Sequence, residues 1–228
     1  MGLTYKYFSG SASTTQKTEV LEWLQNNASD YFDTITADEN GTISCTISGV
    51  LALKFGFTTS NNRLKVYKKS NSETPVYTSS ATATTKYFRF GCKTPYGLCI
   101  KYMSDGAFMW ETLWITRTDN ENVAIVAFIQ TDSTSTGGKY IIGDFSQDKY
   151  FELYTAGSIY DMQKFMYIYN QYFTAIAPIG YGDSTDSINL PDLYMFRFSQ
   201  NQQGNPTFKR LTLDGAEYFT DSYLALKI

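Results

Sequence analysis

The sequence predicts an all-β fold, a β-sandwich or jelly roll with one short helix near the N-terminus, and three observations lead to this prediction. Aromatic residues form 17% of the 228 residues, including 19 Tyr and 16 Phe, and such side chains fit a pleated, half-buried surface. Short runs alternate between apolar and polar residues with a period of two. Turn residues separate these runs at short intervals, as is typical of a sandwich or barrel. We expect residues 1–228 to form a single β domain, with a candidate internal boundary at residues 131–138.

One segment follows a helical pattern. From Thr14 to Ala28, apolar side chains recur on one side and polar side chains on the other. Either Thr14 or Thr15 can act as the N-cap, and Asn26-Asn27 can end the helix. A helix this short needs its apolar side docked on a sheet to persist in water.

The remaining chain reads as strands. Apolar residues alternate with hydroxyl-bearing residues at 42–48, and the turn Glu39-Asn40-Gly41 precedes that run. Alternation continues at 51–58, and Asp214-Gly215 predicts a two-residue hairpin turn. Further strands are expected at residues 64–67, 87–90, 98–103, 112–118, 123–130, 140–142, 150–154, 166–169, 173–176, 193–198, 211–213 and 224–226.

Charge and composition exclude several classes of function. The chain has no His, so Ser-His-Asp and Cys-His nucleophiles and His-ligated zinc or haem fall away. The formal net charge is −3, and without a basic excess we expect no nucleic-acid partner. No secretory signal or membrane-spanning run is visible, so we expect no membrane insertion. We expect no enzyme activity, no catalytic residue, no metal and no cofactor.

The three cysteines do not follow a metal-binding spacing. Cys45, Cys92 and Cys99 lie in apolar, strand-like surroundings, which favours buried free thiols that act as small hydrophobic residues. Cys92 and Cys99 could face each other across a turn at residues 95–97.

The abundance of aromatic residues is the one positive signal of a binding surface. Tyr offers a large contact area with a polar tip, which suits interfaces. The tyrosine-rich segment at 162–173 has more aromatic area than one sheet face can bury, so we expect part of it to meet a neighbouring subunit. The expected interface residues are Tyr160, Phe165, Tyr167, Tyr169, Tyr172 and Phe173. An alternative is a carbohydrate-binding module or glycan-active protein, with Trp110 and Trp114 as glycan contacts.

The C-terminal third resembles a family. Its residues are Ala175-Ile176-Ala177-Pro178-Ile179, then Leu190-Pro191-Asp192-Leu193-Tyr194-Met195-Phe196, and finally the run from Leu211 to Lys227 around Asp214-Gly215. This ending is similar to that of small virion proteins of tailed bacteriophages and prophages of Gram-positive gut bacteria. Those proteins finish with a strand, an Asp-Gly or Asn-Gly turn, Tyr, a small polar pair and an aromatic-aliphatic strand before Lys or Arg. The similarity covers residues 174–228, and more loosely 51–128, and this chain has Ser222 where the pattern has Gly.

The resemblance implies a structural protein of a phage virion, in the tail tip, baseplate or adhesion apparatus. Its partners would be copies of itself in a symmetric oligomer and other virion proteins, with a host surface glycan as a further candidate. A capsid-decorating or head–tail protein is the alternative within this class. Such a protein is made in the host cytoplasm without a signal peptide and ends in the virion.

Overall fold

The computed structural model describes the backbone of most of the chain and the side chains of a smaller part. Described residues are 3–8, 13–58, 63–69, 71–78, 86–93, 97–104, 110–117, 123–130, 138–144, 149–155, 176–182, 187–196, 209–220 and 224–228; side chains are described for 4–8, 13–58, 63–69, 71–78, 113–115, 210–220 and 226–228. In these ranges the chain is all-β with a single short helix, as predicted.

The strands form three antiparallel sheets. The N-terminal sheet contains, in spatial order, β2 (Thr34–Ala37), β3 (Thr42–Ile47), β4 (Leu51–Gly56), β5 (Leu64–Tyr67) and β6 (Tyr77–Thr78). The central sheet contains β1 (Leu3–Phe8), β7 (Lys86–Lys93), β8 (Gly97–Ser104), β9 (Trp110–Arg117), β10 (Val123–Gln130), β11 (Gly138–Asp144) and β12 (Lys149–Thr155). The C-terminal sheet contains β13 (Ile176–Gly182), β14 (Ser187–Phe196), β17 (Leu224–Lys227), β16 (Ala216–Thr220) and β15 (Lys209–Leu213).

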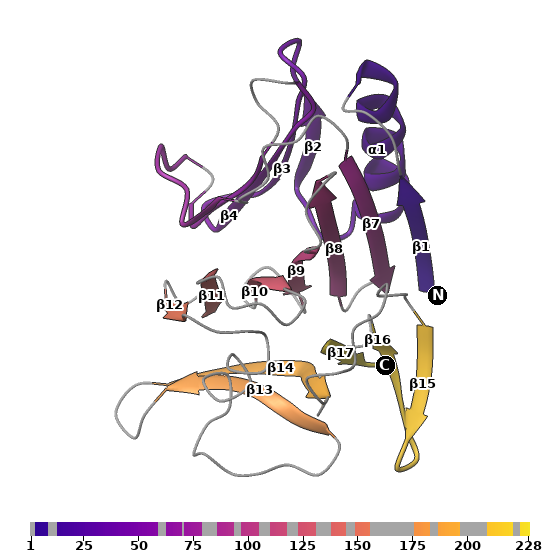
Figure 1. The fold of residues 1–228 in the computed structure, drawn as a ribbon, viewed down its shortest axis with the longest axis vertical. Coiled ribbons are helices and arrows are strands. Elements are labelled where there is room, and N and C mark those ends of the chain that lie inside the picture. The colour runs from indigo at the N-terminus through magenta and orange to yellow at the C-terminus, as the bar shows by residue number, and fades with distance from the viewer. Residues whose placement is uncertain are drawn as a thin grey trace.

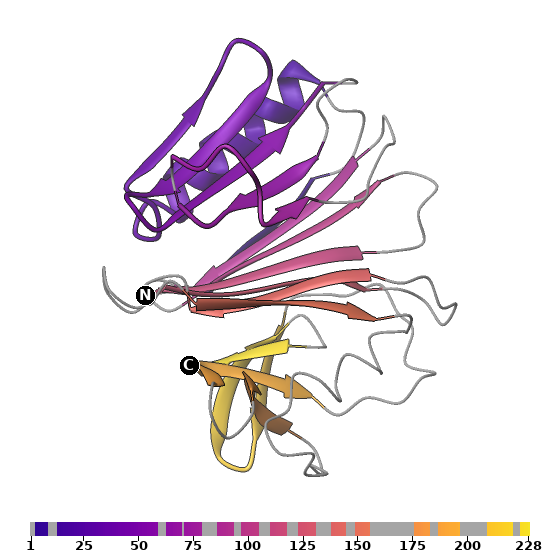
Figure 2. The same cartoon turned by 90° about the vertical axis from the view of Figure 1, so that its left-hand side faces the viewer.

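The three sheets stack in layers, with the central sheet in the middle (Figures 1 and 2). The N-terminal sheet and the helix α1 (Thr14–Asn27) share a core with one face of the central sheet, to which Leu113 and Ile115 contribute. Trp114, between them in sequence, contacts Phe219 of the C-terminal sheet on the other face. Among the described strands, consecutive strands mostly neighbour each other within one sheet. The exceptions are β1 beside β7 and β14 beside β17, so the C-terminal sheet is not a simple meander. The described strands form three sheets and not the two sheets of the jelly roll that the sequence left open.

Helix α1 begins at Thr14, as predicted, but its N-cap lies before the two candidates that the sequence offered. Its N-cap is Ser13, which has extended backbone and whose Oγ accepts a hydrogen bond from the backbone N–H of Gln16 at 3.2 Å. Ser, Thr and Thr follow one another here, so residue type alone could not select the cap. The predicted end at Asn26-Asn27 is confirmed, and the apolar side with Trp23 and Leu24 is buried.

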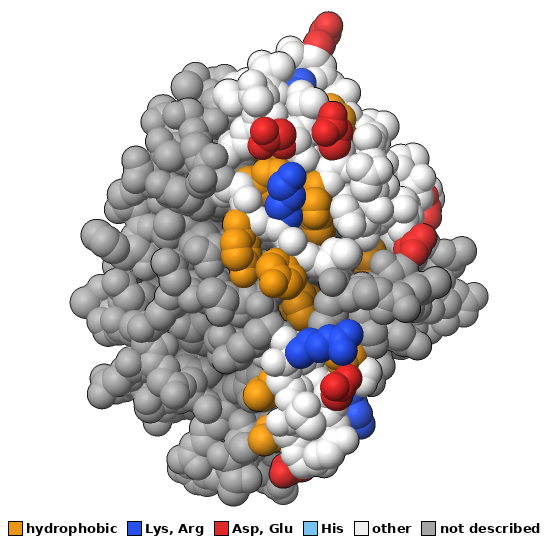
Figure 3. Space-filling model, turned by 90° about the vertical axis from the view of Figure 1, so that its right-hand side faces the viewer, with side chains coloured by type: hydrophobic (Ala, Val, Ile, Leu, Met, Phe, Trp, Pro, Cys, Tyr) orange, Lys and Arg blue, Asp and Glu red, His pale blue; other side chains and the backbone are white. Residues whose placement is uncertain are grey.

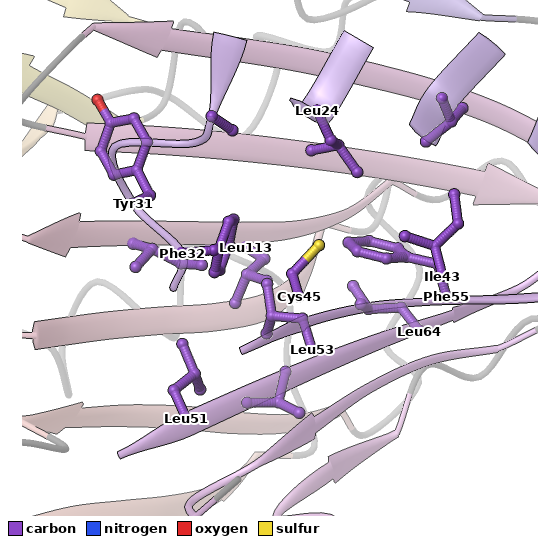
Figure 4. Packing of buried hydrophobic residues seen from close by; sticks show 14 of the residues in the cluster. Leu24, Tyr31, Phe32, Ile43, Cys45, Leu51, Leu53, Phe55, Leu64 and Leu113 are labelled. Carbon is purple, nitrogen blue, oxygen red and sulfur yellow. The ribbon is translucent and has the colours of Figure 1, made fainter. Parts of the chain in front are cut away.

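The N-terminal sheet has one apolar face, and its other face carries polar residues together with the buried Ala52 and Tyr67. Cross-strand pairing places Ile35, Cys45, Leu53, Val66 and Tyr77 in one row across its five strands. All of these except the half-buried Ile35 are buried, and they lie in or against the core beneath α1 (Figure 4). Burial raises the pKa of the Cys45 thiol, so this residue stays neutral and packs as a small hydrophobic side chain, as expected.

The other two cysteines are not cross-strand partners. Cys92 of β7 pairs with Leu98, and Cys99 of β8 pairs with Gly91. Directly paired residues share one face of a sheet and consecutive residues alternate between faces. The two cysteines therefore occupy positions on opposite faces, which corrects the suggestion that they face each other.

Two predicted turns are confirmed by positive backbone φ angles. Asp214 and Gly215 have φ values of 49° and 77° and join β15 to β16 as a two-residue hairpin, as a type I′ turn requires. Gly41, in the turn before β3, has a φ of 82°.

Replacing Gly41 with Ala is expected to cost more stability than replacing Gly49 with Ala. Both glycines have positive φ, but a Cβ on Gly41 would lie 2.7 Å from Cγ2 of Thr58, whereas a Cβ on Gly49 meets nothing within 4 Å. The conformational cost is of order 1 kcal/mol at both sites, and overpacking adds about 1–3 kcal/mol at Gly41 alone. Chemical denaturation of the two variants measures the difference, and equal losses would show that Thr58 moves aside freely.

Candidate interaction surface

The predicted interface lies outside the described residues. All six expected aromatic residues fall in 156–175, which the structure does not describe. The candidate domain boundary at 131–138 also lies outside the described residues, except for residue 138. The strands on either side of it, β10 and β11, pair directly in the central sheet, so the chain before and after this segment belongs to one sheet.

Of the two tryptophans that we expected to contact a glycan, only Trp114 has a described side chain. Trp110 begins β9, where its backbone pairs with Gln130, and its side chain is outside the described set. Trp114 has an exposed fraction of 0%. Its ring packs at 6.0 Å and 63° from Phe219, in an edge-to-face contact. This corrects the sequence interpretation of Trp114: a ring enclosed between two sheets has no face to stack on a sugar.

A different pair of aromatic residues is exposed, on strand β1. Tyr5 and Tyr7 have exposed fractions of 55% and 45%, and they are the large apolar side chains that stand out at the described surface. Their ring centroids are 5.8 Å apart, with an interplanar angle of 33°. We call these two residues the tyrosine pair.

The strand's alternation explains how the tyrosine pair is held. Residues 5 and 7 point to one face of the central sheet, and residues 6 and 8 to the other. Phe8 is buried in the core, and the ammonium of Lys6 lies 5.1 Å from the centre of its ring. Phe8 thus anchors the strand from one face while the tyrosine rings remain accessible on the other.

The sheet register shows why this face is covered in the middle and open at its edge. Tyr5 pairs with Gly91, which pairs with Cys99, which pairs with Trp114, so Tyr5 and Trp114 share a face. The C-terminal sheet covers that face at Trp114, through Phe219. β1 is an edge strand of the central sheet. The tyrosine pair at this edge is exposed, whereas Trp114, farther into the same sheet, is covered by the C-terminal sheet.

The side of the molecule that carries β1 also carries α1 and β15 (Figure 1). On this side, hydrophobic side chains gather between α1 above and the β15–β16 hairpin below, with basic side chains among and beneath them (Figure 3). On the hairpin, Arg210 and Glu217 form an exposed ion pair at 3.9 Å, of the kind that contributes little to stability. An apolar centre with a charged rim is the usual anatomy of a protein interface.

The exposed area of the tyrosine pair limits how much of an interface these two residues can form. A buried aromatic side chain covers about 150–250 Å², so two half-exposed rings leave roughly 200 Å² to bury. A standard interface buries about 800 Å² on each partner. The tyrosine pair is therefore large enough for the energetic centre of an interface, but its rim must come from the surrounding surface.

Sequence reasoning missed these two residues, although a signal was present. Thr4-Tyr5-Lys6-Tyr7-Phe8 alternates tyrosine with other residues, which is a period of two. An edge position could not be inferred, because β1 pairs with β7 about 80 positions later in the chain.

Comparisons of the chain with protein-family models, with curated protein sequences and with solved structures find no match. Among the described residues, no group of Asp, Glu and Cys side chains is arranged to hold a metal ion, and no helix there is long and apolar enough to cross a membrane.

Proposed function

We propose that this chain is a structural protein of a bacteriophage particle, a component of the tail tip, baseplate or adhesion apparatus that works by assembling with copies of itself and with other virion proteins. The phage assignment rests on the C-terminal resemblance. The assembly part rests on one observation, the exposed tyrosine pair on the edge of the central sheet.

The geometry of the chain end supports this proposal. The Asp214-Gly215 turn sends the chain back into β16, where Tyr218 and Phe219 are buried. Leu226 of β17 is also buried. The C-terminal segment that carries the resemblance is therefore an integral layer of the fold, and β1 is left as the described edge with exposed aromatic rings.

Replacing both Tyr5 and Tyr7 with Ser is expected to abolish or weaken assembly while the subunit stays folded. Burying about 200 Å² of aromatic surface stabilises an interface by an upper value of about 5 kcal/mol per subunit, and aromatic anchors dominate interface energies. Sedimentation velocity measures the oligomeric state, and circular dichroism checks the fold. The matched control replaces both residues with Phe, which keeps the ring area and should keep the assembly.

Mass spectrometry of purified particles tests the wider assignment. The chain should be present at a copy number that matches the symmetry of the tail or of the head. A stable monomer that is absent from purified particles contradicts the proposal, and unchanged assembly of the Ser double variant removes the tyrosine pair from the interface.

A further inference from the structure

The outer face of the N-terminal sheet carries a continuous polar row. Cross-strand pairing joins Thr36 to Ser44, Ser44 to Lys54, Lys54 to Lys65, and Lys65 to Thr78. This lysine row runs across all five strands on the face opposite the buried core. With neighbouring strands about 4.8 Å apart, its backbone positions span about 19 Å.

At the centre of the lysine row two like charges stand opposite each other. Lys54 and Lys65 are direct cross-strand partners, an arrangement that destabilises a sheet. No described carboxylate forms an ion pair with either ammonium group. The carboxylates that flank β2 serve turns instead: Asp38 accepts from the N–H of Thr42 at 2.7 Å, and Asp33 from that of Ser48 at 2.8 Å.

One aromatic ring holds a lysine of this pair in place. The ammonium of Lys54 lies 4.8 Å from the ring centre of Tyr67, whose residue is buried. A cation over an aromatic face is attracted by the ring quadrupole. Tyr67 therefore orients the charge on the sheet surface without neutralising it.

The charge around the lysine row differs in sign from that of the rest of the chain. Residues 34–78, which contain all five strands of the row, hold five basic and three acidic residues, whereas the other residues hold 14 basic and 19 acidic residues, a net charge of −5. The basic residues are Lys54, Arg63, Lys65, Lys68 and Lys69. Such an asymmetry attracts an anionic group to this face and repels it elsewhere.

We propose that the lysine row binds an acidic polysaccharide, a sugar polymer that bears carboxylate or ester sulfate or phosphate groups. The two ammonium groups are donors for the anionic groups. Ser44 and Thr78, on either side of them, and Thr36 beyond Ser44 present hydroxyls that both donate to and accept from sugar hydroxyls. A chain that crosses the five strands meets two hydroxyls, two charges and a further hydroxyl in succession.

A nucleic acid fits this face less well. Duplex DNA carries one charge per about 1.7 Å of its axis, which an otherwise acidic protein repels beyond the short basic face. Single strands bind on accessible aromatic platforms, and the row itself contains no aromatic residue, while Tyr67 beside it is buried. A polymer with spaced charges and many hydroxyls matches the row better.

The test measures binding of the intact chain to four probes: a polyuronate, dextran sulfate, neutral dextran and a thymidine oligonucleotide of matched charge. We expect the chain to bind at least one acidic polysaccharide and not neutral dextran. Binding should weaken as salt rises from 0.1 to 1 M, where the screening length falls from about 10 Å to about 3 Å. The two acidic probes distinguish carboxylate from ester groups.

Replacing Lys54 and Lys65 together with Gln should weaken that binding by about tenfold or more. Replacing Lys17 and Lys227 with Gln removes the same charge from other surfaces and should leave binding within about twofold. The Lys54/Lys65 variant should have a denaturation midpoint close to that of the parent, because the loss of the like-charge pair offsets the loss of the contact between Lys54 and Tyr67. This stability readout separates a binding role from a structural one.

The inference is overturned if neither acidic polysaccharide binds, if the two double variants bind equally well, or if the oligonucleotide binds more tightly than the polysaccharides. It is independent of assembly through the tyrosine pair. The Tyr5/Tyr7 variant should therefore retain polysaccharide binding as a monomer, and the Lys54/Lys65 variant should retain the oligomeric state.

Discussion

Replacing Trp114 with Ala is expected to lower the free energy of unfolding by about 3–5 kcal/mol, the cost of deleting a buried Trp or Phe side chain. Trp114 is fully enclosed and packs edge-to-face on Phe219. This contact joins β9 of the central sheet to β16 of the C-terminal sheet. The loss should therefore fall on the association of these two layers, and urea denaturation would measure it.

The conservative substitution Trp114→Phe separates packing from hydrogen bonding. The indole Nε1–H is buried and has no hydrogen-bond acceptor among the described residues. A buried unsatisfied donor costs about 1–3 kcal/mol, so Phe removes that cost while it loses part of the ring volume. We expect these effects to offset each other to within about 1 kcal/mol. A loss as large as that of Trp114→Ala would mean that the N–H donates to an ordered water or another acceptor.

The period-two pattern predicted much of the fold, because strand side chains alternate between faces whatever the partner strand is. The alternation at 42–48 and 51–58 correctly separated Ile43, Cys45 and Leu53 on the buried face from Ser44 and Lys54 on the other. Local chemistry predicted the hairpin at Asp214-Gly215, since that turn requires positive φ at both positions.

Three strands that the sequence did not predict have weak local patterns. β2 has a single large apolar residue, Ile35, and β6 has only two residues. β13 begins with Ile176 and includes Pro178 and two glycines, all of which except the isoleucine disfavour a strand. These strands depend on pairing with neighbours that already have strong patterns.

The middle layer and the candidate surface depend on long-range pairing. Leu113-Trp114-Ile115 is a continuous apolar run, which is the pattern of a strand buried on both faces, and the structure shows both faces covered there. The sequence could not show that Trp114 meets Phe219, about 100 residues later. Nor could it align Lys54 with Lys65, because register is fixed by the whole sheet.

Replacing Leu53 with Ala should lower the free energy of unfolding by about 2–5 kcal/mol, the range for buried Leu side chains. Leu53 is fully buried at the centre of β4, between its cross-strand partners Cys45 and Val66 on the face that packs against the core. Those neighbours are held by cross-strand pairing on both sides, so they cannot collapse easily into the space of the lost methyl groups. The loss should therefore lie in the upper part of this range.

The matched control is the next residue on the same strand. Lys54→Gln changes a side chain on the opposite face, where it relieves the like-charge contact with Lys65. Its free energy of unfolding should stay within about 0.5 kcal/mol of the parent or rise slightly. Equal effects at the two adjacent positions would contradict the placement of Leu53 on the core side of this sheet and of the lysine row on the opposite side. A large loss at Leu53 alone would support it, because Leu53 packs in the core and Lys54 does not.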